Sequence, residues 1–509
     1  MPAKLHPKDE VWKYKKYLCK AICFDISAGS KIVVLNQDEA HENDLYVGHR
    51  VILRKGNKES ICIIDLSADL VKRGEIGLFA EAAEELEAHD GEIVEICHMQ
   101  RPESIEYIKS KMDGKPLSKV QIDTIMRELM QNRLSEAELA SFITSVYIRG
   151  MNDDEVVGLT ESIVKTGNQL NLGVRPICDK HCIGGVAGNR TTMVIVPVVA
   201  AANLYIPKTS SRSITSAAGT ADTMETLCEV SIEIEELKRI VKSCFGCIVW
   251  GGGLQLASAD DKLIKVRNPL SLDPKGVMLA SILAKKKSVG AEYVIIDIPI
   301  GKGAKISTEL QARKLARDFV SIGNKLGMKI LVKITDGSGP IGTGIGPALE
   351  CIDVLSVLNN AGPADLYEKS CMLAGCLLEM AGKVEQGRGK QVAMQIIKSG
   401  KALAKFREIV ELQGGKPNVK ISDVPVARYK VCIEAEKKGL VAHIDNKMIS
   451  KVARAAGAPN DKAAGVLLLC RRGQKVSKGD ALFEIHSNSE AKLDFAIKAL
   501  EGWHPVQII

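Results

Sequence analysis

The sequence predicts an α/β protein that combines a helical bundle with a mostly parallel-sheet α/β domain. An extra β-rich N-terminal domain and an α+β C-terminal domain flank these parts. Apolar runs without alternation, such as residues 293–300 and 329–335, are typical of strands buried in a parallel sheet. Amphipathic helical segments precede and separate these runs. With 509 residues, the chain is also too long for one hydrophobic core, so we expect several domains.

Composition and charge narrow the functional classes. A net charge of +7 on this length is mild, and no basic patch interleaved with aromatic residues occurs, so we expect no nucleic-acid partner. No window of about 18 uncharged apolar residues and no secretory signal are present, which argues against membrane insertion. The fourteen scattered cysteines suggest free thiols in a reducing cytoplasm. Cys244 and Cys247 lack a second pair at zinc spacing, so we expect no metal and no other cofactor.

The first hundred residues alternate short apolar runs with turns. This pattern predicts a β-rich domain over residues 1–100, with one short helix near residues 80–88. Its clearest strands are expected at residues 31–35, 49–54 and 92–96.

Helical periodicity begins after Pro102. Capping boxes are predicted at Ser118 with Gln121, at Ser135 with Glu138, and at Asn152 with Glu155. Apolar residues on one face follow each of the first two boxes. We therefore expect a helical bundle over residues 101–172, joined by a returning segment at about residues 258–290.

Residues 173–421 follow a strand, loop and helix pattern and are expected to form an α/β phosphate-binding domain with right-handed crossovers. Helices are predicted at residues 191–202 and 310–326, and a short strand at residues 205–209. Frequent glycine and proline punctuate short β-like segments in residues 422–509. Part of this region is similar to biotinyl-type β domains, but the modifiable lysine is missing, so we interpret it as a structural module.

The segment 179–192 has the composition of an anion-binding loop. Lys180 and His181 precede the pair Gly184-Gly185, and Arg190, Thr191 and Thr192 follow at an expected helix N-terminus. Glycine allows backbone N–H groups to approach an oxyanion, and a helix N-terminus favours negative charge. The spacing matches neither a Walker A motif nor a dinucleotide fingerprint.

A second loop of this kind spans residues 208–220. It carries seven hydroxyl residues among thirteen, together with Lys208 and Arg212. The loop follows an apolar strand, which favours a shared site at the carboxyl ends of neighbouring strands, although a solvated turn has a similar composition. Lys302 and Lys305 follow another strand and either face the same crevice or form a surface turn. The glycine-rich segment 337–346 is interpreted as a wall or hinge.

Four motifs in order resemble the thymidine/pyrimidine-nucleoside phosphorylase family. Residues 179–186 are similar to its K-H-S-T-G-G-V signature, with Cys182 at the place of the serine. The other three matches are residues 254–267, 280–286 and 297–304. The resemblance runs from about residue 103 to the C-terminus and implies the nucleoside phosphorylase/phosphoribosyltransferase type of fold.

The second loop departs from that family in a direction that suits a phosphorylated substrate. Glycines and a histidine of the nucleoside enzymes are replaced by hydroxyl donors in residues 211–216. Together with Lys305 and the N-terminal domain, this resembles the archaeal AMP phosphorylase branch of the family. That branch converts AMP and phosphate to adenine and ribose 1,5-bisphosphate in nucleotide salvage and degradation. The resemblance therefore implies AMP or another nucleoside monophosphate and inorganic phosphate as partners.

The resemblance also implies roles for individual residues. Asp273 is expected to be the general acid, with a pKa raised by burial, and His181 is the competing proton donor. Ser281 and Lys285 are expected to touch the base, while Arg212 and Lys305 bind the 5′-phosphate. Inorganic phosphate is assigned to Lys180, Gly184, Gly185, Thr192, Ser210 and Thr220. The substrate-binding residues are Gly185, Ser211, Arg212, Ser213, Ile214, Thr215, Ser216, Thr220, Ser281, Lys285 and Lys305.

Three other functions remain open at this stage. A pyrimidine-nucleoside phosphorylase would act on unphosphorylated nucleosides. An anthranilate-type phosphoribosyltransferase would need acidic Mg²⁺ ligands beside the glycine loop, which the sequence does not offer. A nucleotide sensor without catalysis would not need Lys180, His181 and Asp273, so their presence argues against this function. The resemblance further implies a homodimer or a larger homo-oligomer, and it leaves the base preference among AMP, CMP and UMP open.

Overall fold

The computed structural model describes residues 16–213, 216–270, 272–502 and 504–509. Its contacts divide the chain into two compact units. One holds the residues up to 149 together with residues 265–272, and the other holds residues 150–264 and 273–509. Within the described ranges, no helix is both long and apolar enough to cross a bilayer.

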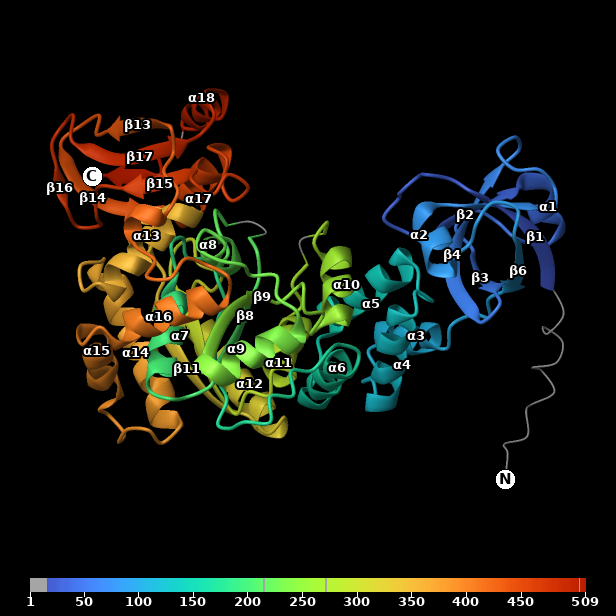
Figure 1. The fold of residues 1–509 in the computed structure, drawn as a ribbon, viewed down its shortest axis with the longest axis horizontal. Helices are drawn as coiled ribbons and strands as arrows, with labels where there is room; N and C mark the ends of the chain where they lie inside the picture. Colours follow the sequence, from blue (N-terminus) through green and yellow to red (C-terminus); the bar gives the residue numbers. More distant parts are fainter. Residues whose placement is uncertain (1–15, 214–215, 271, 503) are drawn as a thin grey trace. The chain divides into compact units, whose positions relative to one another are not determined.

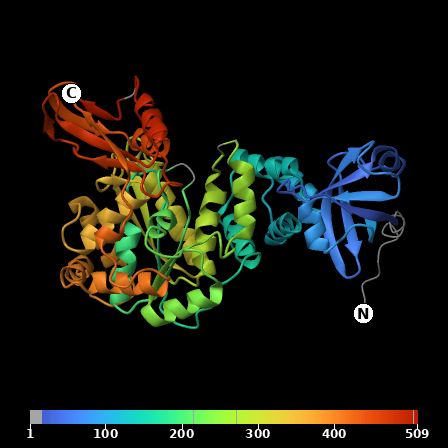
Figure 2. The same cartoon turned by 45° about the horizontal axis from the view of Figure 1, so that its top comes forward.

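The N-terminal strands form a closed barrel in the order β1-β5-β2-β4-β3-β6, drawn in blue in Figure 2. Alternate side chains point inward, so that Val33, Leu53 and Ile76 are fully buried. The β-rich expectation is confirmed. A second short helix, α1, was missed because only Ala40 in it is buried, which leaves no apolar stripe to detect. The elements are β1 Lys16–Cys23, β2 Ile32–Asn36, α1 Gln37–Glu42, β3 Arg50–Lys55, β4 Lys58–Ser67, β5 Glu75–Leu78, α2 Ala80–Leu86 and β6 Ile93–His98.

Four helices follow, and the capping signals predict the starts of three of them, α4, α5 and α6. Ser118 and Asn152 form capping boxes with Gln121 and Glu155, and Ser135 exchanges the same two bonds with Glu138. In the first unit, α3 packs against α4 and α5; in the second unit, α6 packs against α11. The bounds are α3 Ser104–Met112, α4 Lys119–Met130, α5 Glu136–Arg149, α6 Asp153–Lys165 and α11 Lys275–Ser288.

Five parallel strands form the centre of the second unit. Strands β11, β10 and β7 pair in that order, β8 pairs with β9, and a parallel bridge between Ile177 and Tyr205 joins the two groups. Because all five run in the same direction, the loops after their carboxyl ends lie along one edge. The strands are β7 Cys178–Cys182, β8 Ile206–Ser210, β9 Gly246–Trp250, β10 Tyr293–Ile300 and β11 Lys329–Asp336.

Helices enclose this sheet, as Figure 1 shows for β8, β9 and β11. Residues 191–200 of α7 are all buried, and α7 packs against α14 and α16. Helix α12 packs against β10 and β11. The remaining bounds are α7 Thr191–Ala201, α8 Thr220–Met224, α9 Ile234–Cys244, α10 Ser258–Arg267, α12 Glu309–Lys325, α13 Pro347–Leu358, α14 Ala364–Met380, α15 Gly389–Lys398 and α16 Lys401–Leu412.

The C-terminal module consists of two sheets and two helices. One sheet has the order β12-β15-β17-β13, and the other has the order β16-β14-β18. Strand β12 comes from the glycine-rich segment 337–346, so this segment is part of the module's sheet as well as a loop of the α/β region. The bounds are β12 Gly344–Ile345, a 3₁₀ turn Ile421–Asp423, β13 Tyr429–Glu434, β14 Gly439–Ile444, α17 Asn446–Ala455, β15 Gly465–Leu468, β16 Lys475–Val476, β17 Ala481–Ser487, α18 Glu490–Lys498 and β18 Val506–Ile508.

Candidate active site

The first anion loop is closed by a buried lysine. Lys180 lies on β7, opposite Ile295 of β10, and only 1% of its surface is exposed. Its Nζ lies 2.9 Å from Thr191 Oγ1 and 3.4 Å from Thr192 Oγ1, at the start of α7. Burial lowers the pKa of Lys180. The strand end and the helix N-terminus are thus joined around the glycine turn, and a lysine, two hydroxyls and free helix N–H groups gather there.

His181 lies among lysines. Burial, followed by the positive charges of Lys286 and Lys208, holds the pKa of its ring well below the usual range. The ring is therefore neutral near pH 7. It can offer an N–H to a ligand, but an imidazolium donor is scarce at that pH.

Beneath this loop, Asp179 anchors two buried lysines. Its carboxylate lies 2.7 Å from Lys286 Nζ and 3.7 Å from Lys208 Nζ, and all three side chains are almost fully buried. Burial lowers the pKa of Lys208 to about 7. The sequence places Lys208 at the start of the second loop, but in the structure its side chain is buried beside Asp179.

The glycine turn fits tightly against the loop after β10. Gly184 and Gly185 have φ angles of +92° and +90°, which favour glycine. A Cβ on Gly185 would lie 2.4 Å from the backbone nitrogen of Lys305, whereas the space around Gly184 is open. The turn assigned to inorganic phosphate and the segment that carries Lys305 are thus in direct contact.

Asp273 and Lys305 form an ion pair. The expected burial of Asp273 is wrong, because its side chain is 37% exposed. The physical reason is its place just before α11, where Pro274 is the N-cap residue and the chain is still open to solvent. The structure therefore brings these two predicted residues together, with the carboxylate already paired with a cation.

Ser281 and Lys285 meet at a third residue, Asp260. Asp260 Oδ2 lies 2.6 Å from Ser281 Oγ and 2.7 Å from Lys285 Nζ. Asp260 is fully buried, and its other oxygen, Oδ1, has no hydrogen-bond partner within the described chain. Sequence reasoning did not assign Asp260 a role, although it lies in one of the four matching motifs.

One carboxylate holds the second anion loop at two points. Asp222 Oδ2 accepts hydrogen bonds from Ser213 N at 2.7 Å and from Gly219 N at 2.8 Å. Ser210 is the last residue of β8, and Ser211 is exposed. Two predicted residues, Ile214 and Thr215, lie outside the described residues.

Arg212 is engaged by acidic side chains. Its guanidinium forms two bonds to Glu225, at 2.6 and 2.5 Å, and lies 5.0 Å from the centre of the Trp250 ring. The hydrogen bond from Arg212 is the main cause that lowers the pKa of Glu225 to about 2. Lys462 of the C-terminal module also reaches Glu225, at 2.6 Å. The predicted phosphate ligand thus has a carboxylate partner in this structure.

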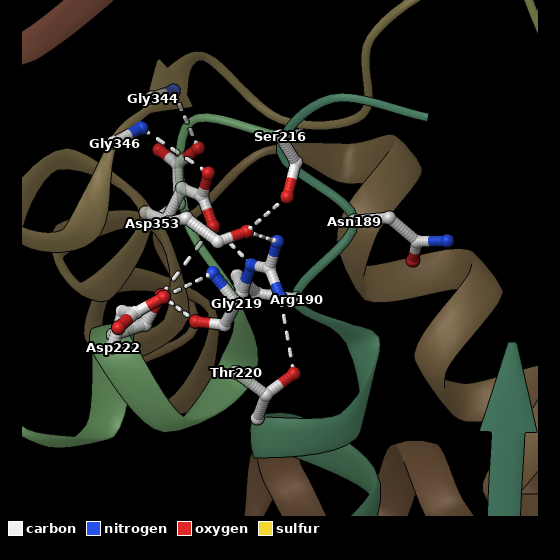
Figure 3. Close-up of polar contacts among 12 residues, drawn as sticks. Asn189, Arg190, Ser216, Gly219, Thr220, Asp222, Gly344, Gly346 and Asp353 are labelled. Carbon is white, nitrogen blue, oxygen red and sulfur yellow. Dashed lines mark hydrogen bonds and ion pairs between the residues drawn. The ribbon is translucent and has the colours of Figure 1, made fainter. Parts of the chain in front are cut away.

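Arg190 connects the two anion loops. It pairs with the buried Glu350 and donates to Thr220 Oγ1 at 3.0 Å and to the carbonyl of Ala218 at 2.8 Å. Figure 3 shows its guanidinium at the centre of these contacts, while the neighbouring Asn189 points away from them. Arg190, which the sequence places among the loop's cations, therefore fixes the second loop against the first.

One further cluster, centred on Asp297, escaped the sequence analysis. Asp297 lies opposite Cys182 in the sheet, 3.0 Å from Lys369 Nζ and 2.6 Å from Thr335 Oγ1. Burial raises the pKa of Asp297, but the charges of Lys180 and Lys369 outweigh it and lower the pKa overall. Burial raises the pKa of Cys182 to about 11, so its thiol is neutral. Among the residues that the structure describes, no group of three His, Cys, Asp or Glu side chains is placed to hold a metal ion.

Comparison with known proteins places these loops in a family. A glycosyl transferase family helical bundle domain matches residues 105–167, and the a/b domain of the same family matches residues 174–403. The pyrimidine nucleoside phosphorylase C-terminal domain matches residues 440–505. AMP phosphorylase of Thermococcus kodakarensis is 46% identical over 485 residues, which cover 95% of this chain and 96% of that protein. AMP phosphorylase of Methanosarcina acetivorans is 45% identical over 484 residues, covering 95% of each.

The chain belongs to the AMP phosphorylase family. This confirms the resemblance seen in the four sequence motifs, and the family is one of enzymes. Among solved structures, anthranilate phosphoribosyltransferase of Thermus thermophilus aligns with a TM-score of 0.53 and 18% identity, covering 60% of this chain and 99% of that one. This similarity concerns the fold alone, and it supports the fold class expected for this chain.

Proposed function

We propose that this chain catalyses the phosphorolysis of nucleoside 5′-monophosphates, converting AMP and phosphate to adenine and ribose 1,5-bisphosphate. One observation carries the proposal: two anion loops follow the neighbouring strands β7 and β8 and are joined by Arg190. Two such loops suit a reaction that holds two phosphoryl groups at once. The curated relatives named AMP phosphorylase support AMP as the nucleotide.

In the proposed reaction, inorganic phosphate binds at the Gly184-Gly185 turn and Thr192, close to the Lys180 ammonium. One of its oxygens attacks C1′ of the ribose while the bond from C1′ to the base nitrogen breaks, and the electron pair leaves with adenine. Charge shifts from phosphate to the base as the sugar becomes oxocarbenium-like. Fixed donors and cations at the two anions therefore stabilise the transition state more than the separated reactants.

Asp273 is the proposed proton donor to the leaving base. The neutral His181 ring is better suited to hold a ligand through its N–H than to supply a proton. In this structure the Asp273 carboxylate is paired with Lys305. A 5′-phosphate that binds Lys305 would compete with Asp273 for this cation.

The remaining assignments follow from the same site. Ser281 and Lys285 are proposed to contact the base, with Asp260 holding both side chains in place. A 5′-phosphate is proposed to bind the second loop, through Ser211, Arg212, Ser213, Ile214, Thr215 and Ser216, with Ser210 and Thr220 shared with inorganic phosphate. We also propose a homodimer or larger assembly in the cytoplasm.

A single assay separates this function from its nearest alternative. Purified protein is incubated with AMP, CMP, UMP, adenosine or thymidine, each with and without phosphate, and release of the free base is measured. We expect phosphate-dependent release from the monophosphates and at least about tenfold lower kcat/KM for the nucleosides, because they lack the 5′-phosphate contacts. Faster turnover of thymidine than of any monophosphate would instead identify a nucleoside phosphorylase.

A further inference from the structure

The C-terminal module places one buried amide side chain against the anion loops. Asn446 is the first residue of α17, and only 2% of its surface is exposed. Capping of this helix is performed by Asp445, whose side chain accepts from Lys447 N and Met448 N. The Asn446 side chain is therefore not needed to cap its own helix, and its contacts lie elsewhere.

Three loops meet at this amide. Asn446 Oδ1 accepts a hydrogen bond from Ala187 N at 3.0 Å, and its Nδ2 donates to the carbonyl of Gly337 at 3.1 Å. A Cβ on Gly303 would lie 3.8 Å from Asn446 Cβ, which is ordinary van der Waals contact. These contacts belong to the loops that follow β7, β11 and β10. Asn446 thus hydrogen-bonds to the loops after β7 and β11 and lies beside the loop after β10.

The contact with Ala187 bears directly on the glycine turn. Ala187 is two residues after Gly185, and its carbonyl accepts from Ile341 N at 3.0 Å, so the backbone around Ala187 is held on both sides. Gly185 in turn packs against the backbone nitrogen of Lys305. Asn446 thus contacts the chain just after the turn assigned to inorganic phosphate, and that turn packs against the lysine assigned to the 5′-phosphate.

We infer that Asn446 is a positioning residue of the phosphorolysis site, acting through the loops after β7 and β11. The inference rests on the proposed function and deepens it, because it makes the C-terminal module part of the active site's support. Arg454 of the same module donates to the carbonyl of Ser216 at 3.1 Å, and Lys462 pairs with Glu225, so the second loop receives similar support. The distance between two anions is what a reaction joining phosphate to a phosphorylated sugar must control.

Kinetics of two variants and a neighbouring control test this role. Asn446→Asp keeps the shape and the acceptor for Ala187 N but loses the donor to Gly337, and Asn446→Ala loses both. Lys447→Ala changes the adjacent exposed residue of the same helix. We expect both Asn446 variants to raise KM for phosphate and for AMP about tenfold, because one or two buried hydrogen bonds that place the loops are lost. Lys447→Ala should stay within about twofold of the wild type.

A merely structural role predicts a different outcome. In that case the melting temperature falls while KM for both substrates stays within about twofold in the folded fraction, and the inference is overturned. An effect in Asn446→Asp but not in Asn446→Ala would also overturn it, because the new negative charge rather than the lost bonds would then be the cause. If the alanine variant does not fold, the isosteric aspartate variant carries the comparison.

Phosphate binding gives a readout that does not need turnover. Saturating inorganic phosphate should raise the melting temperature of the wild type and of Lys447→Ala, and raise that of Asn446→Asp clearly less, because a ligand stabilises in proportion to its affinity. Equal shifts in all three proteins, or no shift in the wild type, would refute the positioning role. A wild type that binds phosphate but releases no adenine would refute the proposed function and leave this comparison valid.

Discussion

At the residue scale, proton transfer to the leaving base is proposed to depend on the carboxyl group of Asp273. We expect Asp273→Asn to lower kcat for AMP by 100-fold or more, since general acid catalysis is typically worth that much, and to leave AMP binding largely intact. Steady-state kinetics measure the first quantity and calorimetric titration with AMP the second. Turnover within about tenfold of the wild type would show that the acid lies elsewhere.

The titration of His181 makes the stability of the native state depend on pH. Its pKa is lowered in the folded state, so the native ring stays neutral while the unfolded chain takes up a proton below about pH 6.5. The unfolded state then binds more protons, and the stability of the native state falls as the pH drops below that value. Above it, both states are neutral and this dependence vanishes.

The corresponding test compares the wild type with His181→Gln. The free energy of unfolding of the wild type should fall relative to the variant by up to about 1.4 kcal/mol per pH unit below pH 6.5. Urea unfolding at several pH values measures this difference. Parallel curves for the two proteins would mean that His181 titrates normally in the folded chain.

At the scale of elements, the contact between two loops depends on a single missing side chain. Gly184 and Gly185 have nearly the same positive φ, so alanine costs about 1 kcal/mol or more of backbone strain at either position. Only at Gly185 does the added methyl collide with the Lys305 backbone. We expect Gly185→Ala to lower kcat/KM for AMP at least about tenfold more than Gly184→Ala. Equal losses in the two variants would indicate that backbone strain alone matters.

Contacts with neighbouring elements also fix the conformation of the second anion loop. Asp222 in α8 ties Ser213 to Gly219, and Arg190 ties Thr220 to the start of α7. The bond from Gly219 to Asp222 is local, whereas the bonds of Asp222 to Ser213 and of Arg190 to Thr220 join residues that are 9 and 30 positions apart. The chain therefore positions the hydroxyl-rich loop through carboxylate and guanidinium groups that remain inside the protein.

The whole molecule consists of two compact units, and only one of them carries the anion loops. Each unit has its own buried residues, so we expect two unfolding transitions in calorimetry. Saturating phosphate should raise the temperature of one transition and leave the other unchanged, because the ligand binds a single unit. A single transition, or equal shifts of both, would contradict this expectation. The division into four domains drawn from the sequence stays a prediction.

Several structural features of this protein could be predicted from local sequence patterns. The fold class, the strand at residues 293–300, the capped helix starts and the family motifs were all predicted correctly, because periodicity, capping and glycine spacing act over a few residues. The two loops assigned to anion binding also stand out by composition, because their glycines and hydroxyl residues are contiguous in the chain, and their binding of anions stays a prediction. The family followed from four such short segments.

Tertiary structure decided how those segments meet. The pairing of Arg190 with Glu350, of Asp273 with Lys305, and of Asn446 with Ala187 joins residues that lie far apart in the chain. The order of the parallel strands and the docking of the C-terminal module bring them together, and no local pattern encodes that order. The burial expected for Asp273 was wrong for the same reason, because exposure depends on what packs over a residue rather than on its neighbours in sequence.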